Sequence, residues 1–170
     1  MQMVKLIEIH LKIVYKKRMN MINWKKKGLL FKPDSNKSWM RTHTMTPRAL
    51  HLNDNLFRVF FSGRNDLNQS NIGYVDIEVD SKNKEIKVLS FPENSALGPG
   101  ELGCFDDSGV TPSCLVNVGE KTFLYYIGWR ARSTVRMELV GGLAISDNKT
   151  DFKRYSKAPI LNKTDKEPIN

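Results

Sequence analysis

The sequence predicts an all-β protein built from a repeated four-stranded unit. Three observations support this: a strand pattern that recurs once along the chain, short β-branched and aromatic runs separated by turn residues, and no convincing helix of three turns. Four antiparallel strands in a unit of this length are typical of a β-propeller blade. The 170 residues hold two complete copies and the start of a third, so we expect part of a propeller.

Three strand-forming segments define the repeat. In the first copy they lie at 47–50, 57–64 and 72–77, and the matching segments of the second copy lie at 112–115, 123–130 and 140–145. Both copies are rich in Val, Ile, Phe and Tyr, which favour pleated strands. Turns and links between strands are expected at 53–55 and 118–121, 65–71 and 132–138, and 81–84 and 147–150, with fourth strands at 85–89 and 152–155.

The second strand of each copy is a nearly continuous apolar run, as a strand covered on both faces needs. In a propeller this cover comes from neighbouring blades, because each unit buries its apolar face against the next. Two units cannot close a ring that typically needs four to eight. We therefore expect exposed blade faces that favour self-association or aggregation of the chain.

Composition and charge restrict the functional classes. The chain carries 27 Lys and Arg against 18 Asp and Glu, a net charge of +9. Residues 1–48 hold twelve of these basic side chains and only two acids, whereas the repeats are close to neutral. A short basic tail of this kind is typical of a solvated segment, so no specific nucleic-acid binding is expected. No apolar run is long enough to span a bilayer and no export signal is evident, so we expect a cytoplasmic protein.

The metal-ligating residue types form no recognisable site. Cys104 and Cys114 lack the spacing and His partners of a zinc site, and we interpret them as reduced, buried, small apolar side chains. His10, His43 and His51 form no ligand motif. We therefore expect no metal and no cofactor.

Several strings of residues resemble one protein group, the bacterial glycosidase-like five-bladed propellers related to glycoside hydrolase families 43, 32 and 130. The resemblance runs from about Trp24 to the C-terminus. The most specific string is Phe105-Asp106-Asp107-Ser108-Gly109-Val110-Thr111-Pro112-Ser113, and the others are Trp24-x-x-x-Gly28-Leu29-Leu30-Phe31-x-Pro33, Arg58-Val59-Phe60-Phe61-Ser62-Gly63-Arg64, Tyr125-Tyr126-Ile127-Gly128-Trp129 and Gly142-Leu143-Ala144-Ile145-Ser146.

The resemblance implies a domain organisation and a missing remainder. Residues 1–21 would be a basic tail or an over-called start, and 22–170 the N-terminal part of the propeller, with blade one at about 40–90 and blade two at about 105–157. About as many residues again would complete the five blades. A chain that is half of such a protein is expected to be incomplete in function.

The resemblance also implies where catalytic acids would lie. Glycoside hydrolysis needs two carboxyl groups on opposite sides of the scissile bond. In the related hydrolases these acids line the central axis near the starts of the inner strands. In the first blade an Asp next to Pro is replaced by Thr46 before Pro47, which leaves His43 as the nearest group able to take a proton. In the third blade, Glu167 precedes Pro168 and resembles an acid that assists the general acid.

In the second blade the candidate acids are Asp106 and Asp107. Adjacent residues on a strand point to opposite faces, so at most one of them reaches the axis. We prefer Asp107, and the alternative is that both are structural and cap a turn with Ser108-Gly109.

Binding residues are expected at the ends of the second strands. Arg64 and Trp129 hold almost equivalent positions there, where an Arg fork can hold a carboxylate, phosphate or paired hydroxyls and a Trp face can cover a sugar ring. Arg130 and Ser113 join them as substrate-binding candidates. Packing between blades is the competing role for each.

The function favoured by the sequence is a carbohydrate-active, glycosidase-like protein that binds or hydrolyses a glycosidic linkage of a bacterial polysaccharide. Whether the intact protein cleaves or phosphorolyses the bond, or only binds its sugar, is left open. The alternatives are a non-catalytic propeller that binds protein partners and an inactive truncated fragment. Convergence of His43, Arg64 and Asp107 on one region favours the sugar site, and scattering to the rim favours the scaffold.

Overall fold

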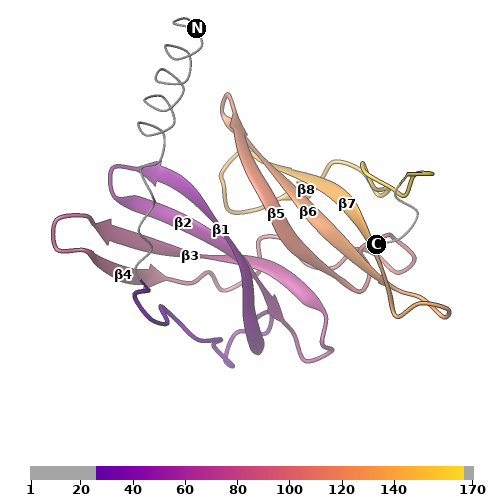
Figure 1. The fold of residues 1–170 in the computed structure, drawn as a ribbon, viewed down its shortest axis with the longest axis horizontal. Coiled ribbons are helices and arrows are strands. Elements are labelled where there is room, and N and C mark those ends of the chain that lie inside the picture. Colours follow the sequence, from indigo (N-terminus) through magenta and orange to yellow (C-terminus); the bar gives the residue numbers. More distant parts are fainter. Residues whose placement is uncertain (1–25, 167–170) are drawn as a thin grey trace, which may run out of the picture.

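The computed structural model describes residues 26–166, and within this range the chain forms eight β-strands and no helix (Figure 1). This confirms the all-β prediction for the described part of the chain. The strands are β1 (Thr42–Asn53), β2 (Leu56–Arg64), β3 (Ser70–Asp80), β4 (Glu85–Ser90), β5 (Gly109–Val118), β6 (Lys121–Ala131), β7 (Met137–Ser146) and β8 (Lys153–Arg154).

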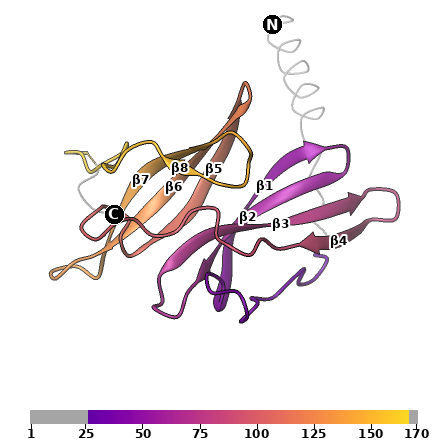
Figure 2. The ribbon, with the colours of Figure 1, turned by 180° about the vertical axis from the view of Figure 1, so that it is seen from behind.

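The strands form two antiparallel units, the first meander (β1–β4) and the second meander (β5–β8). A single parallel pair, Ser70 of β3 with Gly109 of β5, joins them into one open eight-stranded sheet. Figure 2 shows the connection between β4 and β5 crossing from the outermost strand of the first meander to the second. The described residues therefore show two four-stranded repeats and an open sheet, with no closed ring.

The predicted hairpin turns lie where expected, and each contains a residue with positive φ. Asp54 and Gly119, with φ of 37° and 59°, lie in the two-residue turns between β1 and β2 and between β5 and β6. Lys84 and Lys149, with φ of 58° and 62°, close the turns that lead into β4 and toward β8. The hairpin predictions are confirmed to within one or two positions.

The larger apolar cluster lies between the two meanders. Phe60 of β2 meets Phe152 edge-on, with ring centroids 5.5 Å apart, and Phe105 stacks on Tyr126 of β6 at 5.9 Å. Arg58 adds a polar contact, donating from Nη1 to the backbone oxygen of Lys149 at 2.9 Å. The buried members of the cluster are Leu50, Phe60, Ile72, Ala96, Leu97, Phe105, Val110, Leu124, Tyr126, Val140, Ala144 and Phe152.

A second apolar cluster covers the opposite face of the first meander. Trp39 and Met40, 3% and 0% exposed, lie across β2 and β3 and pack on Phe61. Phe31 and Phe91 complete this cover. The middle of β2 is thus buried on both faces, as its apolar run predicted.

β6 is covered on one face only, in agreement with the expectation that two repeats leave a blade face exposed. Its residues alternate between buried and partly exposed, with Leu124 and Tyr126 in the core and Tyr125 37% exposed on the other face. The face that carries Tyr125 has no second sheet against it among the described residues. The second meander is therefore covered on one side only.

Glycine contacts align Gly63 of β2 with Gly128 of β6, whereas the sequence alignment matched Gly63 with Trp129. Gly63 lies under Met40, and Gly128 lies under Phe105; a Cβ would approach these side chains to 3.1 Å and 2.5 Å. A Cβ at Gly128 would force Phe105 to move, and one at Gly63 would require Met40 to give by a few tenths of an ångström. Because strand side chains alternate between faces, shifting the alignment by one position changes which residues of β2 and β6 share a face.

The alignment of the third strands also shifts by one position, so that Ile72 corresponds to Gly141 and not to Val140. Ile72 forms an isolated antiparallel bridge with Leu97, and Gly141 forms the corresponding bridge with Leu161. The segment after each meander therefore returns to the third strand in the same way. This equivalence identifies matching surfaces on the two repeats.

The cysteine prediction is only partly right. Both thiols are free, but Cys114 is exposed on β5 and Cys104 is half-buried in the loop before β5. Cys114 is exposed because it lies on the uncovered face of the second meander, next to Tyr125 in the β5–β6 register. The predicted tail at 1–21, the string that begins at Trp24 and the candidate Glu167 lie wholly or partly outside the described residues.

Candidate functional site

The ends of several strands meet in one row, which we call the strand-end edge. Its members are consecutive Cα partners across both meanders: Thr42, Arg64, Ser70, Gly109 and Trp129. β1, β3 and β5 begin there, and β2 and β6 end there. The open sheet therefore brings Arg64 and Trp129, which are distant in the chain, to the same border.

The start of β1 is irregular. His43 and Thr46 have positive φ values of 61° and 52°, and the pairing with β2 shifts register on both sides of Met45. Such bulges redirect side chains and are common next to functional sites. His43 is exposed, and its Nδ1 lies 2.9 Å from the hydroxyl of Thr42.

Arg64 is held at the strand-end edge by the following loop. Its Nη1 donates to Asn68 Oδ1 at 2.8 Å, while its Nε is buried without a hydrogen-bond partner in residues 26–166. A buried donor left unpaired costs about 1–3 kcal/mol, so the position of this nitrogen destabilises the fold unless an acceptor reaches it.

Trp129 is oriented by a short hydrogen-bond chain. Its indole Nε1 donates to the hydroxyl of Thr111 at 2.9 Å, and this hydroxyl lies 3.4 Å from that of Ser70. The ring is half-buried, so one part of it remains accessible. The hydrogen bond fixes the ring beside the starts of β3 and β5.

Asp107 lies next to this row and caps the loop that precedes β5. Its Oδ1 accepts from the Ser108 hydroxyl at 2.9 Å, and its Oδ2 accepts from the backbone nitrogen of Gly103 at 3.0 Å. Gln69 donates to its backbone oxygen at 3.1 Å. These contacts correspond to the turn-capping alternative, and the carboxylate remains half-exposed.

Asp106 is fully buried and faces away from the solvent. Its Oδ2 accepts from the Tyr126 hydroxyl at 2.9 Å and from Arg154 Nε at 2.8 Å. Gly100 packs so closely that a Cβ there would lie 2.0 Å from Oδ1. This arrangement ties the loop before β5 to β6 and β8, and it leaves no path for a substrate in the structure.

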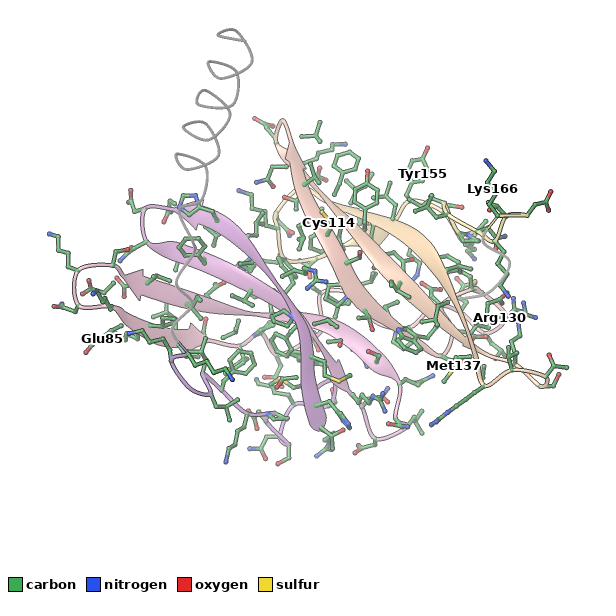
Figure 3. The ribbon with its side chains drawn as sticks, viewed as in Figure 1. Glu85, Cys114, Arg130, Met137, Tyr155 and Lys166 are labelled. Carbon is green, nitrogen blue, oxygen red and sulfur yellow. The ribbon has the colours of Figure 1, made fainter. Side chains whose placement is uncertain are left out.

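The remaining sequence candidates lie in different places. Arg130 pairs with Glu138 in the β6–β7 register and lies close to Met137 at the end of these strands (Figure 3). Ser113 is exposed further along β5, where its backbone oxygen accepts from Arg48 Nε. His43, Arg64, Asp107, Trp129 and Arg130 thus lie at or beside the strand-end edge, whereas Ser113 and Asp106 do not.

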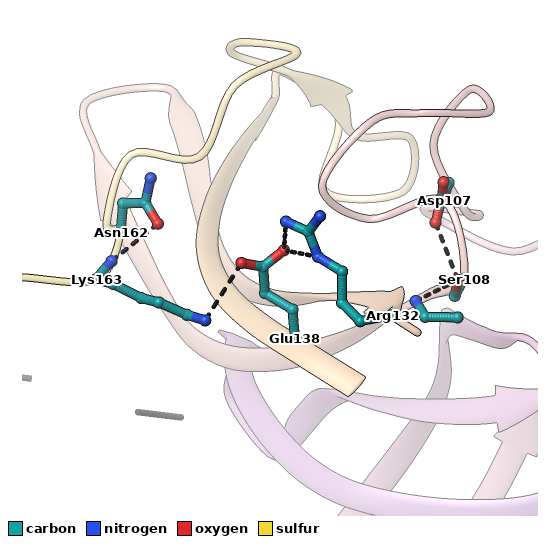
Figure 4. Close-up of polar contacts among 7 residues, drawn as sticks. Asp107, Ser108, Arg132, Glu138, Asn162 and Lys163 are labelled. Atoms are coloured by element: carbon teal, nitrogen blue, oxygen red, sulfur yellow. Dashed lines mark hydrogen bonds and ion pairs between the residues drawn. The ribbon is translucent and has the colours of Figure 1, made fainter. Parts of the chain in front are cut away.

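Sequence reasoning missed an ion cluster beside Asp107. Arg132 donates from both Nε, at 2.8 Å, and Nη2 to Glu138, and Lys163 Nζ lies 3.4 Å from the other carboxylate oxygen (Figure 4). The backbone nitrogen of Ala131 donates to the Ser108 hydroxyl at 3.0 Å, which links this cluster to the Asp107 turn. The hydrogen bond from Arg132 is the main cause that lowers the pKa of Glu138 below its ordinary value.

One sequence signal could have indicated this cluster. Glu138 lies at the start of β7, and the link before it contains the basic residue Arg132. The sequence pattern indicates 132–138 only as the longer link into the third strand. A similar pair, Arg41 Nε and Asp66 Oδ2 at 3.2 Å, lies near the start of β1.

Within residues 26–166 no three His, Cys, Asp or Glu side chains gather in a way that could hold a metal ion. The same part of the chain has no helix of the length and apolar character that crossing a bilayer requires.

No family model matches the sequence. Two curated proteins of Mycobacterium tuberculosis, both described as uncharacterized and taken from strains CDC 1551 and H37Rv, are each 34% identical over 147 residues. The match covers 86% of this chain and 48% of each relative, so the chain spans about half the length of the curated relatives it matches.

Solved structures share the fold at low sequence identity. A glycosyl hydrolase from Bacteroides ovatus has a TM-score of 0.60 and 14% identity, over 84% of this chain and 42% of that one. A member of glycoside hydrolase family 130, from work on enzymes that target β-1,2 mannosidic linkages in Candida mannan, has a TM-score of 0.54 and 16% identity, over 84% and 42%. The chain therefore has a glycosidase-like fold.

Proposed function

We propose that this chain is part of a carbohydrate-active, glycosidase-like protein and that its strand-end edge binds a saccharide. The observation that carries the proposal is the placement of Arg64 and Trp129 at matching ends of β2 and β6, joined through Ser70 and Gly109. An Arg fork and an indole face on one border are a suitable pair for a ring that carries hydroxyls and C–H groups.

The state of Arg64 supports a ligand at this position. Its buried Nε has no partner in the described residues, whereas its Nη1 is already anchored by Asn68. For a sugar hydroxyl or carboxylate to accept from Nε, the groups that bury this atom would have to shift and expose it. Trp129 is likewise pre-oriented, because Thr111 holds its nitrogen and leaves the ring to provide apolar contact.

We further propose that the two meanders are two neighbouring blades of a five-bladed propeller. Each meander has four antiparallel strands, and the match covers 42% of the glycosidase chains, close to two blades in five. In such a ring β1 and β5 would be the inner strands, and the strand-end edge would border the axis.

Binding, rather than bond cleavage, is the role we assign to the described residues. Hydrolysis needs one carboxyl group to protonate the leaving oxygen and a second on the other side of the bond. Asp106 is buried, and both oxygens of Asp107 already accept hydrogen bonds from its own loop. We keep Asp107 and His43 as the proposed polar contacts to the sugar, with a bacterial polysaccharide as its source.

A glycan array followed by titration calorimetry tests this function. We expect the chain to bind a subset of bacterial glycans, and Trp129→Ala and Arg64→Ala each to weaken binding by about tenfold or more. Tyr155→Ala, at an exposed aromatic directly after β8, and Lys87→Ala, at an exposed cation on β4, are matched controls. Binding that is absent from the whole panel, or equal in all four variants, would refute the proposal.

Incubating the same glycans with the full-length mycobacterial relative tests for cleavage. Release of reducing ends would assign hydrolysis to the longer protein, and binding without release would restrict this site to recognition.

A further inference from the structure

Four arginines of the described part of the chain are half-buried, and only two of them have an acidic partner. The four are Arg58, Arg64, Arg130 and Arg154. The first and the last pair with Asp76 and Asp106, in each case with Nε 2.8 Å from a carboxylate oxygen. A guanidinium withdrawn from water stays charged, so its burial costs free energy unless a counter-charge offsets it. Arg64 and Arg130, which we call the arginine pair, pair with no carboxylate of residues 26–166.

The arginine pair lies at one end of the junction between the two meanders. Side chains alternate along a strand, and the pairings of β2 with β3 and of β6 with β7 are regular, so faces can be assigned by counting. Arg64 shares its face of β2 with Phe60, and Arg130 shares its face of β6 with Leu124. Phe60 and Leu124 belong to the apolar cluster between the meanders. Because β2 and β6 both end at the strand-end edge, both arginines border the same end of this junction.

The acidic side chains around this end of the junction already have partners. Glu138 lies opposite Arg130 in the β6–β7 register, but its carboxylate oxygens contact Arg132 and Lys163. Both oxygens of Asp107 accept hydrogen bonds from its own loop. The cations therefore outnumber the carboxylates here, and no acid of the described residues is paired with the arginine pair.

The partners of the other half-buried arginines indicate which chemical group suits this position. Arg58 donates from Nε and Nη2 to the two oxygens of Asp76, both at 2.8 Å, which is the bidentate contact that a guanidinium forms with a carboxylate. A ligand carboxylate would supply the arginine pair with the same contact and with the absent counter-charge. A doubly charged phosphate is less suitable, because the carboxylate of Asp107 beside the site repels each added negative charge.

We infer that the saccharide bound at the strand-end edge is acidic and that the arginine pair binds the carboxylates of its sugar units. The inference rests on the proposed function and adds the chemical class of the saccharide. It also gives Arg130 a role, because this residue lies directly after Trp129 and has no hydrogen-bond or acidic partner in the described residues. The indole of Trp129 then contacts the sugar ring, while the arginines select for its charge.

Titration calorimetry with matched pairs of oligosaccharides tests the inference. Each pair consists of a glycan that contains uronic acids and the same glycan after chemical reduction of its carboxyl groups. We expect the acidic member to bind about tenfold more tightly or better at low salt, and this preference to shrink at high salt because ions screen the arginines.

Three variants locate the preference. Arg130→Gln should reduce it by about tenfold, because one cation of the pair is lost. Arg130→Lys keeps the charge and should lose less of the preference. Lys87→Gln, at an exposed cation on β4, removes the same charge far from the strand-end edge and should leave the preference unchanged. A cooperative thermal transition confirms that each variant is folded before titration.

The outcomes separate this inference from the proposed function. Equal binding of the acidic and the reduced members would overturn the inference and leave the proposed sugar site in place, whereas no binding of any glycan would refute both. An acidic preference that survives both Arg64→Gln and Arg130→Gln would also overturn it. Inorganic phosphate that strengthens binding of the reduced members would identify a free oxyanion as the occupant of the arginine pair, again against the inference.

Discussion

Asp106 has no access to solvent, and two side chains hold its carboxylate. Arg154 Nε and the Tyr126 hydroxyl both donate to Oδ2, and Arg154 also donates to the backbone oxygen of Gly98. A charge buried in this way is tolerated only when its partners are present. The Phe105–Ser113 string resembles the glycosidase motif most specifically, yet its Asp106 stabilises the position of the loop before β5.

Replacing Arg154 should expose the cost of this burial. Arg154→Met leaves Asp106 without its counter-charge, and we expect the free energy of unfolding to fall by about 3–5 kcal/mol. Lys157→Met is the control, because its partner Glu101 and the lysine itself are 73% and 72% exposed, and we expect no measurable change. Urea denaturation at pH 7 measures both. Similar small losses in the two variants would contradict the assignment.

Tyr126 should make the fold sensitive to alkali. The pKa of the Tyr126 phenol is raised well above 10, mainly because the side chain is buried and next because Asp106 lies beside it. The folded state then keeps a proton that the unfolded chain releases, so stability should decline as the pH rises above about 10. Tyr126→Phe removes this group, and the difference between variant and parent should narrow between pH 9 and 11. A constant difference across this range would be inconsistent with the shift.

At the scale of elements, the segment that precedes each meander packs against the second and third strands of that meander. Trp39 and Met40 cover β2 and β3, and Phe105 covers β6 and β7. Glycines make room for these side chains, because a side chain at the same position would occupy their volume. The covering segments therefore lie directly on the strands at these glycines.

Gly73 provides the sharpest test of this close contact. An ideal Cβ at Gly73 would lie 2.2 Å from the Trp39 ring, so Gly73→Ala should displace the ring and cost about 1–3 kcal/mol. At Gly98 the nearest atom to a Cβ is 3.4 Å away, and Gly98→Ala should be nearly neutral. Thermal denaturation and Trp fluorescence follow the two variants. Unchanged fluorescence in Gly73→Ala would argue against the contact.

At the scale of the whole molecule, the two meanders should unfold together. Phe60 of the first meander packs on Phe152 of the second, and Arg58 bonds to the backbone of Lys149. Phe60→Ala should cost about 3–5 kcal/mol and increase amide exchange equally in β2 and β6, within one transition. Leu102 is 98% exposed, so Leu102→Ala should change neither the free energy of unfolding nor the amide exchange. Two separate transitions in the parent chain would show independent units.

Sequence patterns located the strands but not their faces. The alignment of the repeats was wrong by one position in both β2 and β3, since apolar residues occupy consecutive positions there and either register preserves the pattern. The contacts of Gly63 and Gly128 decide the alignment, because a side chain that covers the strand contacts only one of two neighbouring residues. The same limitation left open which of Asp106 and Asp107 would be buried.

The sequence by itself determined the all-β class, the four-stranded repeat, its turns and the presence of Arg64 and Trp129 near the ends of the second strands, because these depend on local periodicity and backbone preference. The match between these two residues was fixed by the strand pairing in the structure. Tertiary structure alone decided that Asp106 is buried, that Glu138 pairs with Arg132 and Lys163, and that one face of the second meander is open. These properties arise from contacts between residues distant in the chain, which no local pattern encodes.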